Sequence, residues 1–136
     1  MSAENVALVR RSKETFNRGD RDGALESFAE DVEWVHPLDP FSGPQVFHGR
    51  SELRAFWAKV DAVWDDFRSE AQEYIDAGER VVVPARVTGR GRTSGAEVSM
   101  VEIEVLTIRD GAIAHRSAYA ELDEALRAVG LTKRGP

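Results

Sequence analysis

Cysteine is absent from this chain of 136 residues, and histidine occurs only three times. The lack of cysteine excludes disulfides, thiolate nucleophiles and metal sites built on cysteine. The three histidines do not have the spacing of metal ligands on a helix or strand, so we predict no bound metal. No Gly-x-Gly-x-x-Gly, P-loop or nucleophile-elbow motif is present, which excludes nucleotide-binding and serine-hydrolase functions. We therefore expect no cofactor.

Basic residues are too few and too scattered for a nucleic-acid-binding surface. Lysine and arginine number 18 against 24 acidic residues, a formal net charge of -6, so nucleic acid is not expected as a partner. No apolar segment approaches membrane-spanning length, and the N-terminus lacks the pattern of a signal peptide. We therefore predict a cytoplasmic protein that does not bind a membrane. Length and composition favour one domain over 1–136, with 132–136 as a loose tail.

The spacing of apolar residues predicts three helices in the first half of the chain. The first covers 4–18 and ends at Gly19, and Asp20 caps the second. The buried residues of the second helix are Ala24, Leu25 and Phe28. Ser51 is the expected N-cap of the third helix, which is the most apolar. Its apolar residues, spaced by three and four, are Leu53, Phe56, Trp57, Val60, Val63, Trp64 and Phe67.

Alternation of apolar and polar residues predicts a strand over 32–36, with Val32, Trp34 and His36 on one side. Pro37 ends this strand because it has no N–H to donate, and a long loop is expected over 37–49.

The second half of the chain is predicted to be rich in strands. A weak strand is expected over 68–77, followed by a turn and a stronger strand from Arg80. Pro84 within that strand predicts an edge position or a bulge. A short terminal helix over 122–129 is closed by Gly130.

Residues 98–119 contain two β-rich runs on either side of Asp110-Gly111, the strongest short signal for a hairpin. A two-residue turn at Asp110-Gly111 would place Ile103 and Val105 beside Arg116. A three-residue loop from Arg109 to Gly111 would instead place Glu104 opposite Arg116. The face of the sheet would then group Glu102, Glu104, Leu106, Arg116 and Ala118. We favour the three-residue loop, because it gives the guanidinium group carboxylate partners.

This order of elements predicts an α+β fold in which three N-terminal helices lie against a curved, antiparallel or mixed sheet and enclose a pocket. Five motifs, together spread over nearly the whole chain, resemble the NTF2-like superfamily in its SnoaL-like polyketide cyclase and ketosteroid isomerase branch. The motifs are FNRGDRDGAL (16–25), FAEDVEW (28–34), FHGRSEL (47–53), IRDGAI (108–113) and EALRAVGL (124–131). The resemblance implies a cone-shaped fold, a deep pocket for a small hydrophobic molecule, and a homodimer formed through the sheet.

The same resemblance suggests catalytic residues. His36 matches the carboxylate base of the steroid isomerases, which is also followed by proline, and a neutral imidazole can do the same work. Glu104 matches an acid that donates a hydrogen bond to the enolate. If Arg116 faces Glu104, the carboxylate stays ionised and the pair orients the substrate instead; the alternative is a surface ion pair. Ser12 replaces a tyrosine of the oxyanion hole, which argues against steroid isomerisation, and Ala118 replaces an acidic partner found in the cyclases.

Aromatic residues are predicted to line the pocket, although helix-spaced aromatics are also typical of ordinary core. The expected pocket residues are Ser12, Phe16, Trp34, Phe56, Trp57 and Ala118.

These residues predict a cofactor-independent isomerase or cyclase that transfers a proton on a hydrophobic carbonyl compound, with His36 as base. Glu104 and Arg116 would orient the substrate, or position a water in an enzyme that opens epoxides or removes water. The alternative from another class is a non-catalytic protein that binds a small ligand, or a dimerisation module that uses the convex sheet face. The interface residues would then be Ile103, Val105 and Tyr119.

Overall fold

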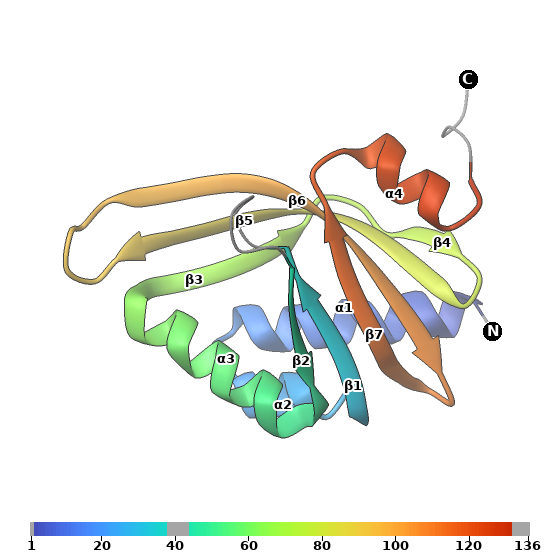
Figure 1. Ribbon diagram of the computed structural model, residues 1–136, viewed down its shortest axis with the longest axis horizontal. Helices are drawn as coiled ribbons and strands as arrows, with labels where there is room; N and C mark the ends of the chain where they lie inside the picture. Colours follow the sequence, from blue (N-terminus) through green and yellow to red (C-terminus); the bar gives the residue numbers. More distant parts are fainter. Residues whose placement is uncertain (1, 38–43, 132–136) are drawn as a thin grey trace.

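The protein was analysed as a computed structural model that describes residues 2–37 and 44–131 (Figure 1). A single curved sheet of seven strands forms its centre, in the order β2-β1-β7-β6-β5-β3, with β4 also paired to β5. β1 and β7 are parallel, and the other pairs are antiparallel. The strands are β1 (Phe28–His36), β2 (Gln45–His48), β3 (Trp64–Ala71), β4 (Ile75–Ala77), β5 (Arg80–Gly91), β6 (Glu97–Arg109) and β7 (Ala112–Tyr119).

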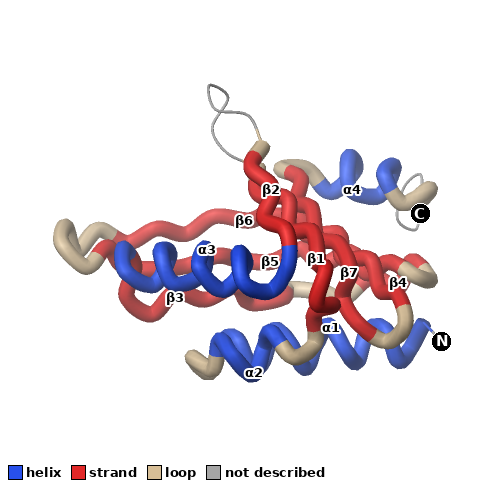
Figure 2. Tube along the Cα trace, turned by 60° about the horizontal axis from the view of Figure 1, so that its bottom comes forward, coloured by secondary structure: helices blue, strands red, loops and turns tan. Residues whose placement is uncertain are grey.

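Helices cover both faces of this sheet. The inner face carries α1, α2 and α3, whereas α4 lies on the outer face (Figure 2). The helices are α1 (Ser2–Asn17), α2 (Arg21–Leu25), α3 (Gly49–Val63) and α4 (Leu122–Ala128). This arrangement confirms the predicted α+β fold with a curved sheet, leading helices and a short terminal helix.

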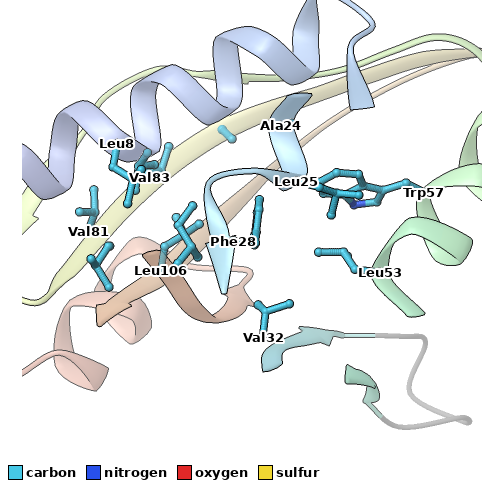
Figure 3. Packing of buried hydrophobic residues seen from close by; sticks show 14 residues of the cluster. Leu8, Ala24, Leu25, Phe28, Val32, Leu53, Trp57, Val81, Val83 and Leu106 are labelled. Carbon is cyan, nitrogen blue, oxygen red and sulfur yellow. The ribbon is translucent and has the colours of Figure 1, made fainter. Parts of the chain in front are cut away.

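The main core fills only part of the space between the helices and the inner face. Leu8 of α1, Trp57 of α3 and Leu106 of β6 are buried in one cluster with Val81 and Val83 of β5 (Figure 3). The rest of the inner face, toward the start of β6 and the end of β7, is left to the cavity described below.

Capping residues set the ends of α1 and α2 as predicted. Gly19 has a φ of +92°, which suits the residue after a helix. The Asp20 carboxylate accepts a hydrogen bond of 2.8 Å from the Gly23 backbone N–H. Phe28 was wrongly assigned to the second helix, because α2 ends at Leu25 and Phe28 begins β1.

The third helix both begins and ends earlier than predicted. Its N-cap is His48, so the cap predicted at Ser51 is wrong. α3 ends at Val63, and the aromatic residues Trp64 and Phe67 belong to β3. A bulge in β3 shifts the pairing with β5 between Asp65 and Arg68, and Asp66 takes a φ of +52°. The extra residue lets Trp64 and Phe67, three apart, share one face of the strand. Apolar residues at such a bulge have the same spacing as on one face of a helix, which explains the wrong prediction.

The β6–β7 hairpin has a two-residue turn, so the predicted three-residue loop is wrong. Asp110 and Gly111 both have positive φ, and Arg109 pairs with Ala112. A register shift next to Thr107 then moves the pairing by one residue, so that Glu104 pairs with Ala118. Glu102, Glu104 and Leu106 therefore do share a face with Arg116 and Ala118. The predicted grouping is correct, although the bulge, not the loop, produces it.

Pro84 lies inside the sheet, not at an edge as one alternative proposed. β5 has β6 on one side and β3 and β4 on the other. The Pro84 carbonyl accepts a hydrogen bond of 2.8 Å from the Gln72 N–H, in the gap between β3 and β4. In an antiparallel strand the N–H and C=O of one residue lie on the same side, so an N–H at this position would also face the gap. Proline lacks this donor, and no strand runs through the gap to need it.

The outer face of β6 is covered within the chain. Ile103 and Val105 are each 4% exposed and pack against Ala125 and Leu126 of α4. These two side chains are therefore unable to supply the dimer interface predicted for the convex face. The tail predicted over 132–136 lies outside the described residues. Within the described part of the chain, no helix is long and apolar enough to cross a membrane.

Candidate active site

A cavity of about 620 Å³ opens between α1, α3 and the inner face of the sheet. Its volume is in the range of pockets that hold small organic molecules. The cavity brings together all the residues proposed from the sequence. These are His36, Glu104, Arg116, Ser12, Phe16, Trp34, Phe56, Trp57 and Ala118.

Aromatic rings form much of the cavity wall, and they brace one another. Trp57 of α3 meets Phe16 of α1 edge to face at 5.0 Å between ring centroids, and meets Trp34 of β1 at 5.7 Å. Trp57 is 5% exposed and belongs to the core, whereas Phe16, Trp34 and Phe56 are half-buried. The aromatic residues thus serve as core and cavity lining at once, and present flat apolar surfaces.

One end of the cavity holds a charged cluster, defined here as Lys13, Glu102, Glu104 and Arg116. The Glu104 carboxylate accepts hydrogen bonds from Lys13 Nζ at one oxygen and from Arg116 Nε, at 2.9 Å, at the other. Arg116 also donates to Glu102 at 2.6 Å and to the Val35 carbonyl at 3.2 Å. Glu104 is 3% and Arg116 2% exposed. This is a buried network, so the alternative of a surface ion pair is wrong.

Glu104 is ionised at neutral pH. Burial raises the pKa of its carboxyl group, but the adjacent Lys13 ammonium and Arg116 guanidinium lower that pKa to about 2. The group is therefore unable to donate a proton as the corresponding acid of a steroid isomerase does.

Arg116 joins the strands that carry the site. Its guanidinium carbon lies 4.2 Å from the centroid of the Trp34 ring, on the strand beside it. Stacking on an aromatic face and charge-assisted hydrogen bonds both favour a planar guanidinium over a lysine ammonium. Arg116 thus contacts both Trp34 of β1 and the two glutamates of β6.

His36 ends β1 and lies on the cavity wall, with its ring centroid 5.0 Å from that of Phe56. Burial, and secondly the positive charge of Arg116, lower the pKa of the imidazole below its usual 6.5. The ring is therefore neutral at pH 7. Its buried Nδ1 has no hydrogen-bond partner among the described residues.

Sequence reasoning missed Lys13 and Ser69. Lys13 of α1 donates to Ser69 Oγ of β3 at 2.9 Å as well as to Glu104. The missed signal was helical spacing, since Lys13 lies four residues after Val9 and three before Phe16, on the buried side of the helix.

Ser12 and the two histidines other than His36 do not take part in the charged cluster. Ser12 lines the cavity, but its hydroxyl donates to the Ala24 carbonyl at 3.2 Å. His48 ends β2 near Glu33, and His115 of β7 pairs with Thr107 on the face opposite Arg116. In residues 2–37 and 44–131, no group of three His, Cys, Asp or Glu side chains is placed to hold a metal ion.

The curved sheet, the helices over its inner face and the cavity between them define a domain of the NTF2-like fold. The chain belongs to the SnoaL-like family, because the family profile of the SnoaL-like domain matches residues 9–116. The predicted family membership is therefore confirmed. No curated protein matches the chain.

Solved structures place the fold among SnoaL-like and ketosteroid isomerase-like proteins. An NTF2-like protein of unknown function from Burkholderia pseudomallei is 28% identical (TM-score 0.76; 93% of this chain and 97% of that one covered). A protein with a ketosteroid isomerase-like fold from Catenulispora acidiphila is 20% identical (TM-score 0.71; 91% and 92%). One described as a SnoaL-like polyketide cyclase from Mesorhizobium loti is 21% identical (TM-score 0.65; 83% and 96%).

Proposed function

We propose that this protein is a cofactor-independent enzyme of the isomerase or cyclase type, which moves a proton on a hydrophobic carbonyl compound. His36 acts as the base, and Glu104 with Arg116 orients the substrate. The observation that carries the proposal is a neutral imidazole on the wall of a largely aromatic cavity. An uncharged base is ready to accept a proton from a carbon atom next to a carbonyl group.

The charged cluster supports this chemistry electrostatically. Removing a proton beside a carbonyl group places negative charge on the carbonyl oxygen, and preorganised cations stabilise that charge best in a dry site. Lys13 and Arg116 are held in place by Glu104, whose carboxylate stays ionised. The cavity therefore combines a base, fixed positive charges and an apolar wall.

Water activation by Glu104, the basis of the epoxide-opening or dehydrating alternative, has less support. Both carboxylate oxygens of Glu104 already accept hydrogen bonds from cations. An oxygen engaged in this way is a poor base toward water. Steroid isomerisation is also not expected, because the Ser12 hydroxyl is committed to a backbone carbonyl.

Hydrogen–deuterium exchange tests the proposal without knowledge of the natural substrate. The probe is 2-tetralone, a bicyclic ketone with acidic C–H bonds, incubated with the protein in D2O and followed by NMR. We expect the protein to accelerate deuterium incorporation, and the change His36→Gln to reduce the acceleration about 100-fold, the usual contribution of a general base. His115→Gln is the matched control, because His115 lies on the opposite face of β7 from Arg116.

Each outcome separates the candidate functions. Exchange that persists in the His36→Gln variant would place the base elsewhere. Binding of 2-tetralone to the wild-type protein without any exchange would favour the non-catalytic ligand-binding alternative. Mass spectrometry of a ligand retained through purification would then identify the natural compound.

The homodimer and the cytoplasmic location stay predictions. With Ile103 and Val105 covered, we place the dimer surface on the β5–β6 arm that projects from the body in Figure 1. Met100 and Val101 on this arm are 56% and 39% exposed. Contact with a second copy at this arm would remove these apolar side chains from water.

A further inference from the structure

Lys13 is a largely buried cation on the cavity wall, and the proposed mechanism gives it no direct contact with the substrate. Its side chain is only 10% exposed, and it lines the cavity together with Val9 and Phe16 of the same helix. Lysine is rarely buried to this degree unless its ammonium group is paired.

The partners of Lys13 leave part of its ammonium group unused. Nζ donates to Ser69 Oγ at 2.9 Å and to one oxygen of Glu104. An ammonium group carries three hydrogens. Among the residues that the structure describes, no third acceptor is within hydrogen-bond distance of Nζ. One N–H of Lys13 is therefore available to a molecule in the cavity.

Lys13 is also the more accessible cation of the charged cluster. The Arg116 side chain is 2% exposed, and three of its N–H groups already donate to Glu104, Glu102 and Val35. Both oxygens of Glu104 accept hydrogen bonds from these cations. Glu104, as a carboxylate, has no hydrogen to donate. Lys13 is therefore the member of this pair that can donate to an acceptor atom of a ligand.

We infer that Lys13 donates its remaining hydrogen bond to an oxygen atom of the ligand and thereby determines which end of an apolar ligand meets the charged cluster. The ligand class is a flat apolar body that carries a carbonyl, enol or phenol oxygen. This inference rests on the proposed function for the identity of the ligand cavity. It adds a residue that contacts the ligand directly and that determines the orientation of the ligand in the cavity.

Binding of two matched probes tests the inference. 2-Naphthol and naphthalene have the same apolar body, and only the first carries an oxygen. Equilibrium dialysis of the full chain should give a preference for 2-naphthol of about tenfold, the value of a hydrogen bond to a charged group. Lys13→Met should abolish this preference, and the ratio of the two affinities, not either affinity alone, is the readout. Lys59→Met, at an exposed position of α3, is the control and should behave as wild type.

The outcomes distinguish this inference from the proposed function. A preference that survives in Lys13→Met would overturn the role of Lys13 and leave the His36 mechanism intact. Equal affinity of the wild-type protein for both probes would do the same. Failure of the wild-type protein to bind either probe would contradict the ligand cavity, and with it both proposals. If Lys13→Met does not fold, Lys13→Gln, which can still donate to Glu104, should also lose most of the preference.

Discussion

Replacement of Glu104 by glutamine tests whether the buried charges act as a unit. The pKa of the Glu104 carboxyl is lowered from its ordinary 4.5 to about 2. At about 1.4 kcal/mol for each pKa unit, this gap corresponds to about 3 kcal/mol of stability at neutral pH. Glu104→Gln removes that contribution and leaves Lys13 and Arg116 without their shared carboxylate, so a loss of about 3 kcal/mol is expected at pH 7.

The pH dependence of this loss has a definite sign. A carboxyl group whose pKa is lower in the folded protein stabilises it above the unfolded pKa, and that stabilisation disappears as pH falls through the folded value. The free energy of unfolding of the wild-type protein should thus exceed that of Glu104→Gln by a constant amount above about pH 5. The difference should shrink from pH 4.5 toward pH 2, where wild-type Glu104 also becomes protonated.

Urea unfolding followed by tryptophan fluorescence measures both quantities, because the chain contains three tryptophans. Glu26→Gln, which makes the same change of charge at an exposed position, is the control and should change stability by less than about 0.5 kcal/mol. Equal stability of wild type and Glu104→Gln at pH 7 would refute the electrostatic reasoning. A large loss that does not change with pH would assign the effect to packing instead.

Four further predictions concern the base, the guanidinium group, the hairpin and the arm. Deuterium exchange by the wild-type protein should fall as the pH is lowered, with its midpoint below pH 6.5, because burial and the charge of Arg116 lower the pKa of His36. Arg116→Met should raise the pKa of His36, measured by NMR titration, since it removes a nearby positive charge. Gly111→Ala should lower stability by about 1 kcal/mol in urea unfolding, because φ at Gly111 is +75°. Met100→Glu should convert a dimer to a monomer in light scattering, and an unchanged mass would move the interface away from the arm.

In the β6–β7 hairpin, the position of the turn and the face that carries Glu104 and Arg116 were predicted correctly, but the loop length and the bulge were not. The Asp110-Gly111 turn is readable from sequence because few residues tolerate positive φ. The register beyond the turn depends on a bulge next to Thr107, and no local residue pattern indicates it. The requirement that a buried arginine has carboxylate partners nevertheless predicted that Glu104 and Arg116 share one face of the sheet. This requirement does not depend on the loop length.

The end of α3 illustrates the opposite case. Periodicity of apolar residues predicted a helix through Phe67, yet the chain becomes a strand at Trp64. Spacing by three is shared by a helix and a bulged strand, and pairing with β5 decides between them. β2 was missed for a similar reason, since Gln45–His48 forms a strand only through its pairing with β1.

The sequence alone indicated the α+β class, because periodicity and turn residues are local properties, and its motifs indicated the family by resemblance. Charge pairing favoured a face that carries Glu104 and Arg116 together, but the register of β6 and β7 decided it. Only the tertiary structure decided that Lys13 of α1 reaches the Glu104 carboxylate, and that α4 covers Ile103 and Val105. Contacts between segments about 90 residues apart depend on how the helices pack on the sheet. The residues on one helix face do not specify which strand packs against them.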